Sequence, residues 1–228
     1  MGRDDAHATS VVSSDLLGTV SVVCRAGTLK AGADGASVAL GRDVQGLSPI
    51  WASDPIAQTL EECQMTLGEG PCMDAVATGL PVLVDDIRAT RGAVLAWPAF
   101  VRDVAALDVR GVFAFPLQIG VIALGSLELY RCEPGRLTPP ELTAALNAAD
   151  VLSGVVLGVG ARPDASDVVP HYRLVVHQAA GMITVQLDVP IDEAMTRLRA
   201  RAYGEGRSIN DVAAGVVDGS LRFSEEES

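Results

Sequence analysis

The pattern of the chain changes at residues 161–170: strand patterns occur only before this segment, and only helical patterns follow it. The segment contains two prolines, a serine and aspartates, a composition typical of a linker. A length of 228 residues suits one or two domains, at ~100–200 residues per domain. We therefore predict two domains, at 11–160 and 171–222, with a flexible N-terminus at 1–10 and an acidic tail at 223–228.

The first domain alternates helical and strand patterns. Two apolar runs around Gly120 predict an antiparallel hairpin at the centre of a sheet, and Pro139 marks the start of a long helix. The helix that begins near Ser53 is expected to carry Glu61 and Glu62 on its outer face. This pattern predicts an α+β fold, with helices flanking a mostly antiparallel sheet. The strands are expected at 36–40, 48–52, 81–84, 112–119 and 121–130, and the helices at 13–26, 53–67, 72–77, 97–107 and 139–160.

The composition limits the partners and the compartment. A net charge of -12 opposes general binding of polyanions, so any role with nucleic acid must depend on a local patch. None of the four cysteines forms a C-x-x-C pair and only three histidines occur, so no metal site is expected. The longest apolar run, at 151–161, is too short to span a bilayer, and the first residues lack a signal-peptide pattern. We expect a cytoplasmic protein with free thiols and no membrane partner.

The pattern of the second domain predicts three helices. The first covers 171–187, and the other two carry apolar stripes that begin at Ile191 and Ile209. Ser208, followed three residues later by Asp211, is typical of a helix start. Short helices of this kind bury their apolar faces only against one another, so we predict a small three-helix bundle. All six basic residues of this domain are arginines, which suit phosphates and guanine edges.

Four segments of this bundle resemble the ANTAR domain in order and spacing: 177–182, 192–194, 198–202 and 211–213. The resemblance implies a three-helix RNA-binding module that acts as a dimer. Such modules bind paired hairpins in nascent mRNA and favour an antiterminator structure over a terminator. The residues that the resemblance places at the RNA are Arg173, His177, Gln178, Gly181, Arg197, Arg199 and Arg201.

Two of these assignments have structural alternatives. Arginines beside an apolar stripe often cover its edges with their stems and only reach into solvent. Gly181 within a helix costs ~1 kcal/mol relative to alanine, which indicates a close approach of the backbone either to RNA or to another helix. The first helix of the bundle also departs from the family because it carries few basic residues.

The first domain resembles a GAF domain, of the variety often fused to ANTAR, through the segments 68–72, 85–86, 97–98, 112–116 and 125–130. GAF domains bind cyclic nucleotides, haem, tetrapyrroles or small metabolites, or only mediate dimerisation. This sequence lacks the Asn-Lys-Phe-Asp-Glu signature of the cyclic-nucleotide binders. No histidine occurs within 8–170, which argues against histidine-ligated haem. No cofactor is assigned, and the ligand class stays open.

Two cysteines are candidates for redox chemistry. Cys72 follows a tight turn at an expected helix N-terminus, where partial positive charge lowers the pKa of a thiol, and Cys63 lies nine residues upstream. The simpler interpretation is that both are small buried apolar side chains. The acidic pair Asp85 and Asp86 is expected to cap the following turn, because adjacent strand residues point to opposite faces.

The main hypothesis is a transcription antitermination regulator that is not an enzyme, in which a GAF-like sensor controls an RNA-binding bundle. One alternative is a dimeric small-ligand or redox sensor that acts through protein contacts, and another is a GAF-type thiol reductase. The apolar helices at 13–26 and 140–160 indicate a homodimer.

Overall fold

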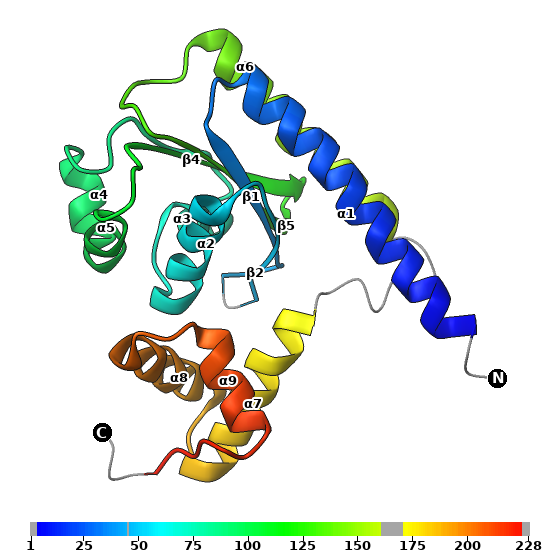
Figure 1. Ribbon diagram of the computed structural model, residues 1–228, viewed down its shortest axis with the longest axis vertical. Coiled ribbons are helices and arrows are strands. Elements are labelled where there is room, and N and C mark those ends of the chain that lie inside the picture. The colour runs from blue at the N-terminus through cyan, green and yellow to red at the C-terminus, as the bar shows by residue number, and fades with distance from the viewer. Residues whose placement is uncertain (1–3, 45, 161–170, 225–228) are drawn as a thin grey trace.

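The computed structural model describes residues 4–44, 46–160 and 171–224, and the side chains of 15–44, 46–158 and 175–224 (Figure 1). Five strands in this part of the chain form one antiparallel sheet of order β2-β1-β5-β4-β3. The predicted hairpin is confirmed, since β4 and β5 pair from one end to the other and β5 lies at the centre. The strands are β1 (Gly35–Leu40), β2 (Ser48–Ala52), β3 (Val82–Val84), β4 (Gly111–Ile119) and β5 (Ile122–Arg131).

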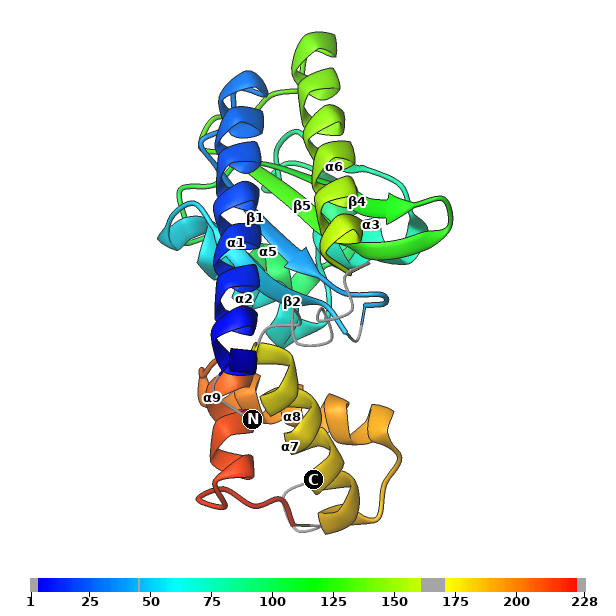
Figure 2. The same ribbon diagram turned by 90° about the vertical axis from the view of Figure 1, so that its right-hand side faces the viewer.

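Two long helices, α1 (Asp4–Lys30) and α6 (Pro139–Gly160), lie side by side and antiparallel on one face of the sheet (Figures 1 and 2). Val20 of α1 and Leu152 of α6 are fully buried there, in one apolar cluster with strand residues such as Phe115. This layer forms because both helices present an apolar stripe to the pleated surface of the sheet.

The start of α1 differs from the sequence-based prediction. The helix begins at Asp4, so it includes residues 4–10, which were expected to be flexible. The physical reason is that no glycine or proline occurs between Asp4 and Leu17, so nothing in the sequence breaks the helix there.

The opposite face of the sheet is covered by shorter helices. Asp54 caps α2 (Pro55–Leu67), because its carboxylate accepts hydrogen bonds from two backbone N–H groups of the first turn. The Tyr130 hydroxyl of β5 donates to the same carboxylate over 3.0 Å, which fixes α2 to the sheet. The other helices on this side are α3 (Pro71–Thr78), α4 (Arg91–Ala96), which was not predicted, and α5 (Pro98–Val104).

The last three helices form a bundle of their own, as Figure 2 shows. Leu198, Ile183 and Val212 are fully buried at its centre. The predicted cap is confirmed, since the Ser208 hydroxyl accepts from the Asp211 N–H. The helices are α7 (His171–Leu187), α8 (Ile191–Glu205) and α9 (Ile209–Val217).

The bundle packs against the sheet domain. Helix α2 contacts α8 and α9, and α7 contacts β2. Leu47 and Met65 of the sheet domain belong to the same apolar cluster as Leu198 of the bundle. The predicted linker at 161–170 lies outside the described residues, as do residues 225–228 of the acidic tail.

Helix α6 has an unusually apolar surface. In the part of the chain that the structure describes, the segment Pro139–Gly158 is the one stretch long and apolar enough to cross a membrane by length and composition alone. Only 28% of its most apolar window is buried. The helix packs on α1 and β4 with its buried side, and Leu146, Val151 and Leu157 are exposed.

Candidate functional site

The core between the sheet and helices α2 and α3 contains a group of polar side chains. Glu61 of α2, Cys72 of α3 and Glu128 of β5 are each at most 1% exposed. The Cys72 Sγ lies 3.2 Å from Glu128 Oε2 and 3.7 Å from Glu61 Oε1. Ser37 donates a hydrogen bond to Glu61 over 2.8 Å, and Gln64 donates one to Glu128 over 2.9 Å. We call Glu61, Cys72 and Glu128 the buried triad.

The periodicity of α2 explains why Glu61 lies inside. It falls on the buried stripe of this helix with Ala57 and Gln64, at spacings of one helical turn. The prediction that Glu61 lies on the outer face is therefore wrong. Glu62, next in the chain, is half-buried and accepts a hydrogen bond from Gln58.

Burial raises the pKa of both carboxyl groups of the triad, because the charged forms lose their hydration. The pKa of Glu61 rises to about 7. The pKa of Glu128 rises to about 8, through burial first and then through the neighbouring charge of Glu61. The Cys72 thiol lies in the first turn of α3, yet burial and the charges of both carboxylates raise its pKa well above the ordinary value. The position of Cys72 at a helix N-terminus therefore does not lower its pKa, and Cys72 is a small buried side chain, as the simpler interpretation has it.

The second candidate thiol lies apart from the triad. Cys63 is half-buried on α2, and burial followed by the negative charges of Asp103 and Glu62 raises its pKa to about 11. All four cysteines of the chain are free. Neither candidate redox cysteine thus has the stabilised thiolate that reactive thiols need.

The turn between α2 and α3, Gly68–Pro71, holds Cys72 in place. Gly68 ends α2 with φ of 71°, and its N–H donates to the Gln64 carbonyl. The Glu69 carboxylate accepts from two backbone N–H groups at the start of α5, over 2.8 and 2.9 Å. A Cβ on Gly70 would lie 2.5 Å from the Gln64 side chain. The glycines are thus required by conformation and by close packing.

The acidic pair after β3 is structural. Asp85 accepts a hydrogen bond from Arg136 over 2.8 Å, and Asp86 pairs with Arg110 through two hydrogen bonds. Asp86 also accepts from the Arg88 N–H, which is the turn cap that the sequence indicated. Its hydrogen bonds to Arg110 hold the pKa of Asp86 below its usual value.

The predicted RNA-facing residues of α7 lie on the surface of the bundle. His177 and Gln178 are exposed, and His177 lines a cleft of about 310 Å³ with Arg42 of the β1–β2 loop. Gly181 is exposed, and apart from its chain neighbours and the backbone of its own helix no described atom lies within 4 Å of the point where its Cβ would be. Helix packing therefore does not explain this glycine here. The side chain of Arg173 lies outside the described residues.

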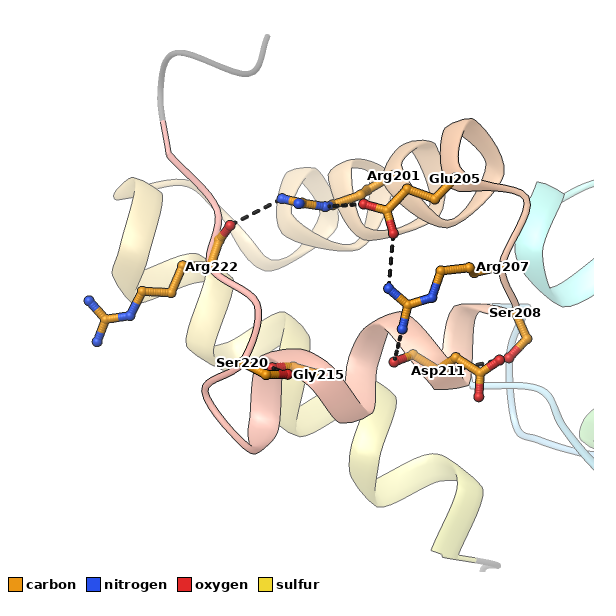
Figure 3. Close-up of polar contacts among 8 residues, drawn as sticks. All are labelled: Arg201, Glu205, Arg207, Ser208, Asp211, Gly215, Ser220 and Arg222. Atoms are coloured by element: carbon orange, nitrogen blue, oxygen red, sulfur yellow. Dashed lines mark hydrogen bonds and ion pairs between the residues drawn. The ribbon is translucent and has the colours of Figure 1, made fainter.

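Two predicted arginines of α8 form ion pairs on their own helix. Arg197 pairs with Glu193 over 2.7 Å, and Arg201 pairs with Glu205 over 2.8 Å. Arg201 also donates to the backbone carbonyl of Arg222, whose own guanidinium points away from this network (Figure 3). Ion pairs on the surface of a helix contribute only ~0.2–1 kcal/mol.

Arg199 faces the sheet domain instead. A Cβ on Gly68 would lie 3.1 Å from its Nη1, so the guanidinium lies against the α2–α3 turn. Burial lowers the pKa of Arg199. Beside it, the Arg102 guanidinium of α5 lies 5.4 Å from the centre of the Tyr203 ring of α8. The predicted RNA residues thus do not form one surface, because Arg199 points into the domain contact.

Sequence reasoning missed several residues of these sites. The first two are Glu61 and Glu128. Each is a charged residue at a position where the pattern of its helix or strand calls for a buried apolar one, and this feature could have identified them. Arg207 was not singled out either. It links the Glu205 carboxylate to the Asp211 carbonyl and so joins α8 to α9 (Figure 3).

Comparison with solved structures identifies the fold of the sheet domain. The chain is similar to a domain of a two-component sensor histidine kinase protein from Sinorhizobium meliloti, with a TM-score of 0.52 and 16% identity, over 63% of this chain and 91% of that one. It is also similar to a GAF domain of Synechocystis in its photoproduct state, with a TM-score of 0.50 and 13% identity, over 64% and 95%. The sheet domain therefore has the GAF fold, which is compatible with many functions.

A third similar structure is an enzyme, a type II free methionine-R-sulfoxide reductase from Thermoplasma acidophilum. It matches with a TM-score of 0.47 and 12% identity, over 64% of this chain and 96% of that one. No protein-family model matches the sequence, and the comparison with curated proteins found no match.

Proposed function

We propose that the chain is an RNA-binding regulator of transcription antitermination, in which the GAF-fold sensor domain controls an ANTAR-like bundle. The bundle would bind paired hairpin loops in nascent mRNA. The observation that carries the proposal is Gly181, an exposed glycine in the middle of α7 with open space around it. A glycine within a helix lowers the stability of that helix. Close approach of an RNA backbone to Gly181, beside His177 and Gln178 one turn earlier, would account for its presence.

The arginines of α8 supply the charge for such a complex. Arg197 and Arg201 are held in ion pairs that phosphate can displace, and arginine binds phosphate through two parallel hydrogen bonds. Arg199 lies in the contact with the sensor domain. A signal that loosens this contact would expose Arg199, which gives the sensor domain a physical means of control.

The test is binding of the purified chain to RNA that carries two adjacent hexaloop hairpins, over a range of salt concentrations. Binding should require the loops and weaken as salt rises, because phosphate contacts release counterions. An Arg197→Ala, Arg201→Ala double variant should lose it. The matched control is an Arg25→Ala, Arg136→Ala double variant, which removes the same charge from the surface of the sensor domain. Equal loss in both variants, or binding to loop-mutant RNA, would refute the proposal.

The alternatives predict other outcomes. A small-ligand or redox sensor that acts through protein contacts would show no RNA binding at low salt in any variant. A thiol reductase would need Cys72 or Cys63 as a nucleophile, and raised pKa values at both thiols disfavour this chemistry. We therefore propose a protein that is not an enzyme, and Cys72→Ser and Cys63→Ser variants should retain RNA binding.

We further propose that the regulator is a cytoplasmic homodimer joined through α1 and α6. Both helices expose large apolar side chains, which marks a surface for another protein chain. These residues are Leu17, Val22 and Leu29 of α1 and Leu146, Val151 and Leu157 of α6. Light scattering of the purified chain should give twice the monomer mass, and a monomeric mass would contradict the dimer.

A further inference from the structure

The buried triad brings together three side chains that can bind a metal ion. A carboxylate oxygen of Glu61, one of Glu128 and the Sγ of Cys72 all lie within 4.8 Å of one another. They come from three separate elements, α2, β5 and α3, each fixed by the packing of the sheet domain. The group is therefore a built feature of the core and not a surface cluster of acids.

The distances within the triad fit a tetrahedral ion. Zinc lies about 2.3 Å from a thiolate sulfur and about 2.0 Å from a carboxylate oxygen. At a tetrahedral angle these bonds place the sulfur about 3.5 Å from each oxygen. The two observed distances, 3.2 Å to Glu128 and 3.7 Å to Glu61, lie on either side of this value.

Each carboxyl group of the triad also has one oxygen without a hydrogen-bond partner among the described residues. These are Glu61 Oε2 and Glu128 Oε1, which are buried and are not the two oxygens that lie near the Cys72 Sγ. The groups that set the pKa of these two carboxyls are Ser37, Gln64, Cys72 and the carboxyls themselves, and none of these is a cation. Buried charge of this kind must be neutralised by protons or by a bound cation.

We propose that Glu61, Cys72 and Glu128 bind a divalent transition-metal ion of the zinc type. A thiolate together with two carboxylates selects zinc or cobalt over magnesium and calcium, which prefer oxygen alone. Ser126 lies two residues before Glu128 on the same face of β5, is fully buried, and offers a further oxygen. The proposal does not depend on RNA binding.

Binding exchanges protons for the metal. The ion replaces the thiol proton and any proton held by the two carboxyls as three bonds to the metal form. The released protons pass to solvent, and a net charge of about -1 remains on the ion and its three anionic ligands. Binding should therefore strengthen as pH rises.

The experiment titrates the metal-free, full-length chain with Co²⁺ without oxygen and follows its absorption. A thiolate bound to cobalt gives a charge-transfer band in the near ultraviolet, and tetrahedral cobalt gives intense visible bands. We expect both at one equivalent, their loss on addition of Zn²⁺, and release of protons to the solvent on binding. The near-ultraviolet band should be absent in Cys72→Ser and retained in Cys24→Ser, another buried thiol.

A second variant keeps the test decisive if Cys72→Ser does not fold. Glu128→Gln has nearly the shape of the native residue and removes one ligand, so its affinity for Zn²⁺ should fall at least tenfold. Glu62→Gln, on the outer side of α2, should leave the affinity unchanged. Absence of the thiolate band in the native chain, or its persistence in Cys72→Ser, would overturn the proposal, and so would equal affinities in the two Glu variants.

Discussion

Raising the pH should destabilise the sheet domain when no metal is bound, because the buried triad releases protons inside the core. The carboxyls of Glu61 and Glu128 have pKa values of about 7 and about 8 in the folded chain, against the ordinary value of 4.5. An acid whose pKa is raised by folding binds protons more tightly in the folded state. Its contribution to stability is complete below pH 4.5 and is lost as pH rises to about 8.

The magnitude follows from these shifts. Each pKa unit corresponds to about 1.4 kcal/mol, and integration between pH 5.5 and 8.5 gives roughly 2 kcal/mol from Glu61 and roughly 3 kcal/mol from Glu128. The native chain should therefore lose several kcal/mol of unfolding free energy over this range. Glu128→Gln should lose at most about half as much, because one titrating group is gone.

Urea unfolding with a chelator present, followed by tryptophan fluorescence, measures this effect. Both tryptophans of the chain, Trp51 and Trp97, lie in the sheet domain, so the signal reports that domain alone. Glu62→Gln is the control, and it should show the same pH dependence as the native chain. Stability that stays constant or rises between pH 5.5 and 8.5 would refute the reasoning.

Three further predictions concern stability. Ser208→Ala removes the cap on the Asp211 N–H and should lower the unfolding free energy of the bundle by ~1 kcal/mol, measured by circular dichroism in urea; no change would contradict the cap. Phe100→Ala empties a fully buried position and should cost ~3–5 kcal/mol in the fluorescence assay, and a loss under ~1 kcal/mol would contradict tight packing there. Gly125→Ala should cost at least ~3 kcal/mol in the same assay, because Gly125 has a φ of 152° and an added Cβ would overlap a carbonyl oxygen of β1; a fully stable variant would contradict this backbone path.

The sequence predicted the elements of the fold well because local rules decide most of them. The hairpin around Gly120 and the helix after Ser208 have signals within a few residues, and both are confirmed. Helix α4 was missed because its six residues, between the β3 turn and Trp97, are too few to show a period.

The candidate site was harder to predict because it depends on contacts between distant segments. Glu61 and Glu128 are 67 positions apart, and only the packing of α2 on the sheet brings them to the same thiol. The sequence therefore placed Cys72 at the start of α3 and could not show the two carboxyls that raise its pKa. The position of Arg199 could not be predicted for a similar reason, since its contact with Gly68 belongs to the other domain.

The turn at residues 68–71 connects the buried triad to the contact between the sheet domain and the bundle. At one end Gly68 lies against Arg199 of the bundle. At the other end the Cys72 N–H donates to the side-chain oxygen of Gln64 over 2.7 Å. The side-chain nitrogen of Gln64 in turn donates to Glu128 over 2.9 Å. The backbone carbonyl of Gln64 also accepts the Gly68 N–H that ends α2, so a change at the triad would reach Gln64 first. The contacts from the triad to the domain interface are therefore continuous, and they run through a segment whose glycines leave little room for adjustment.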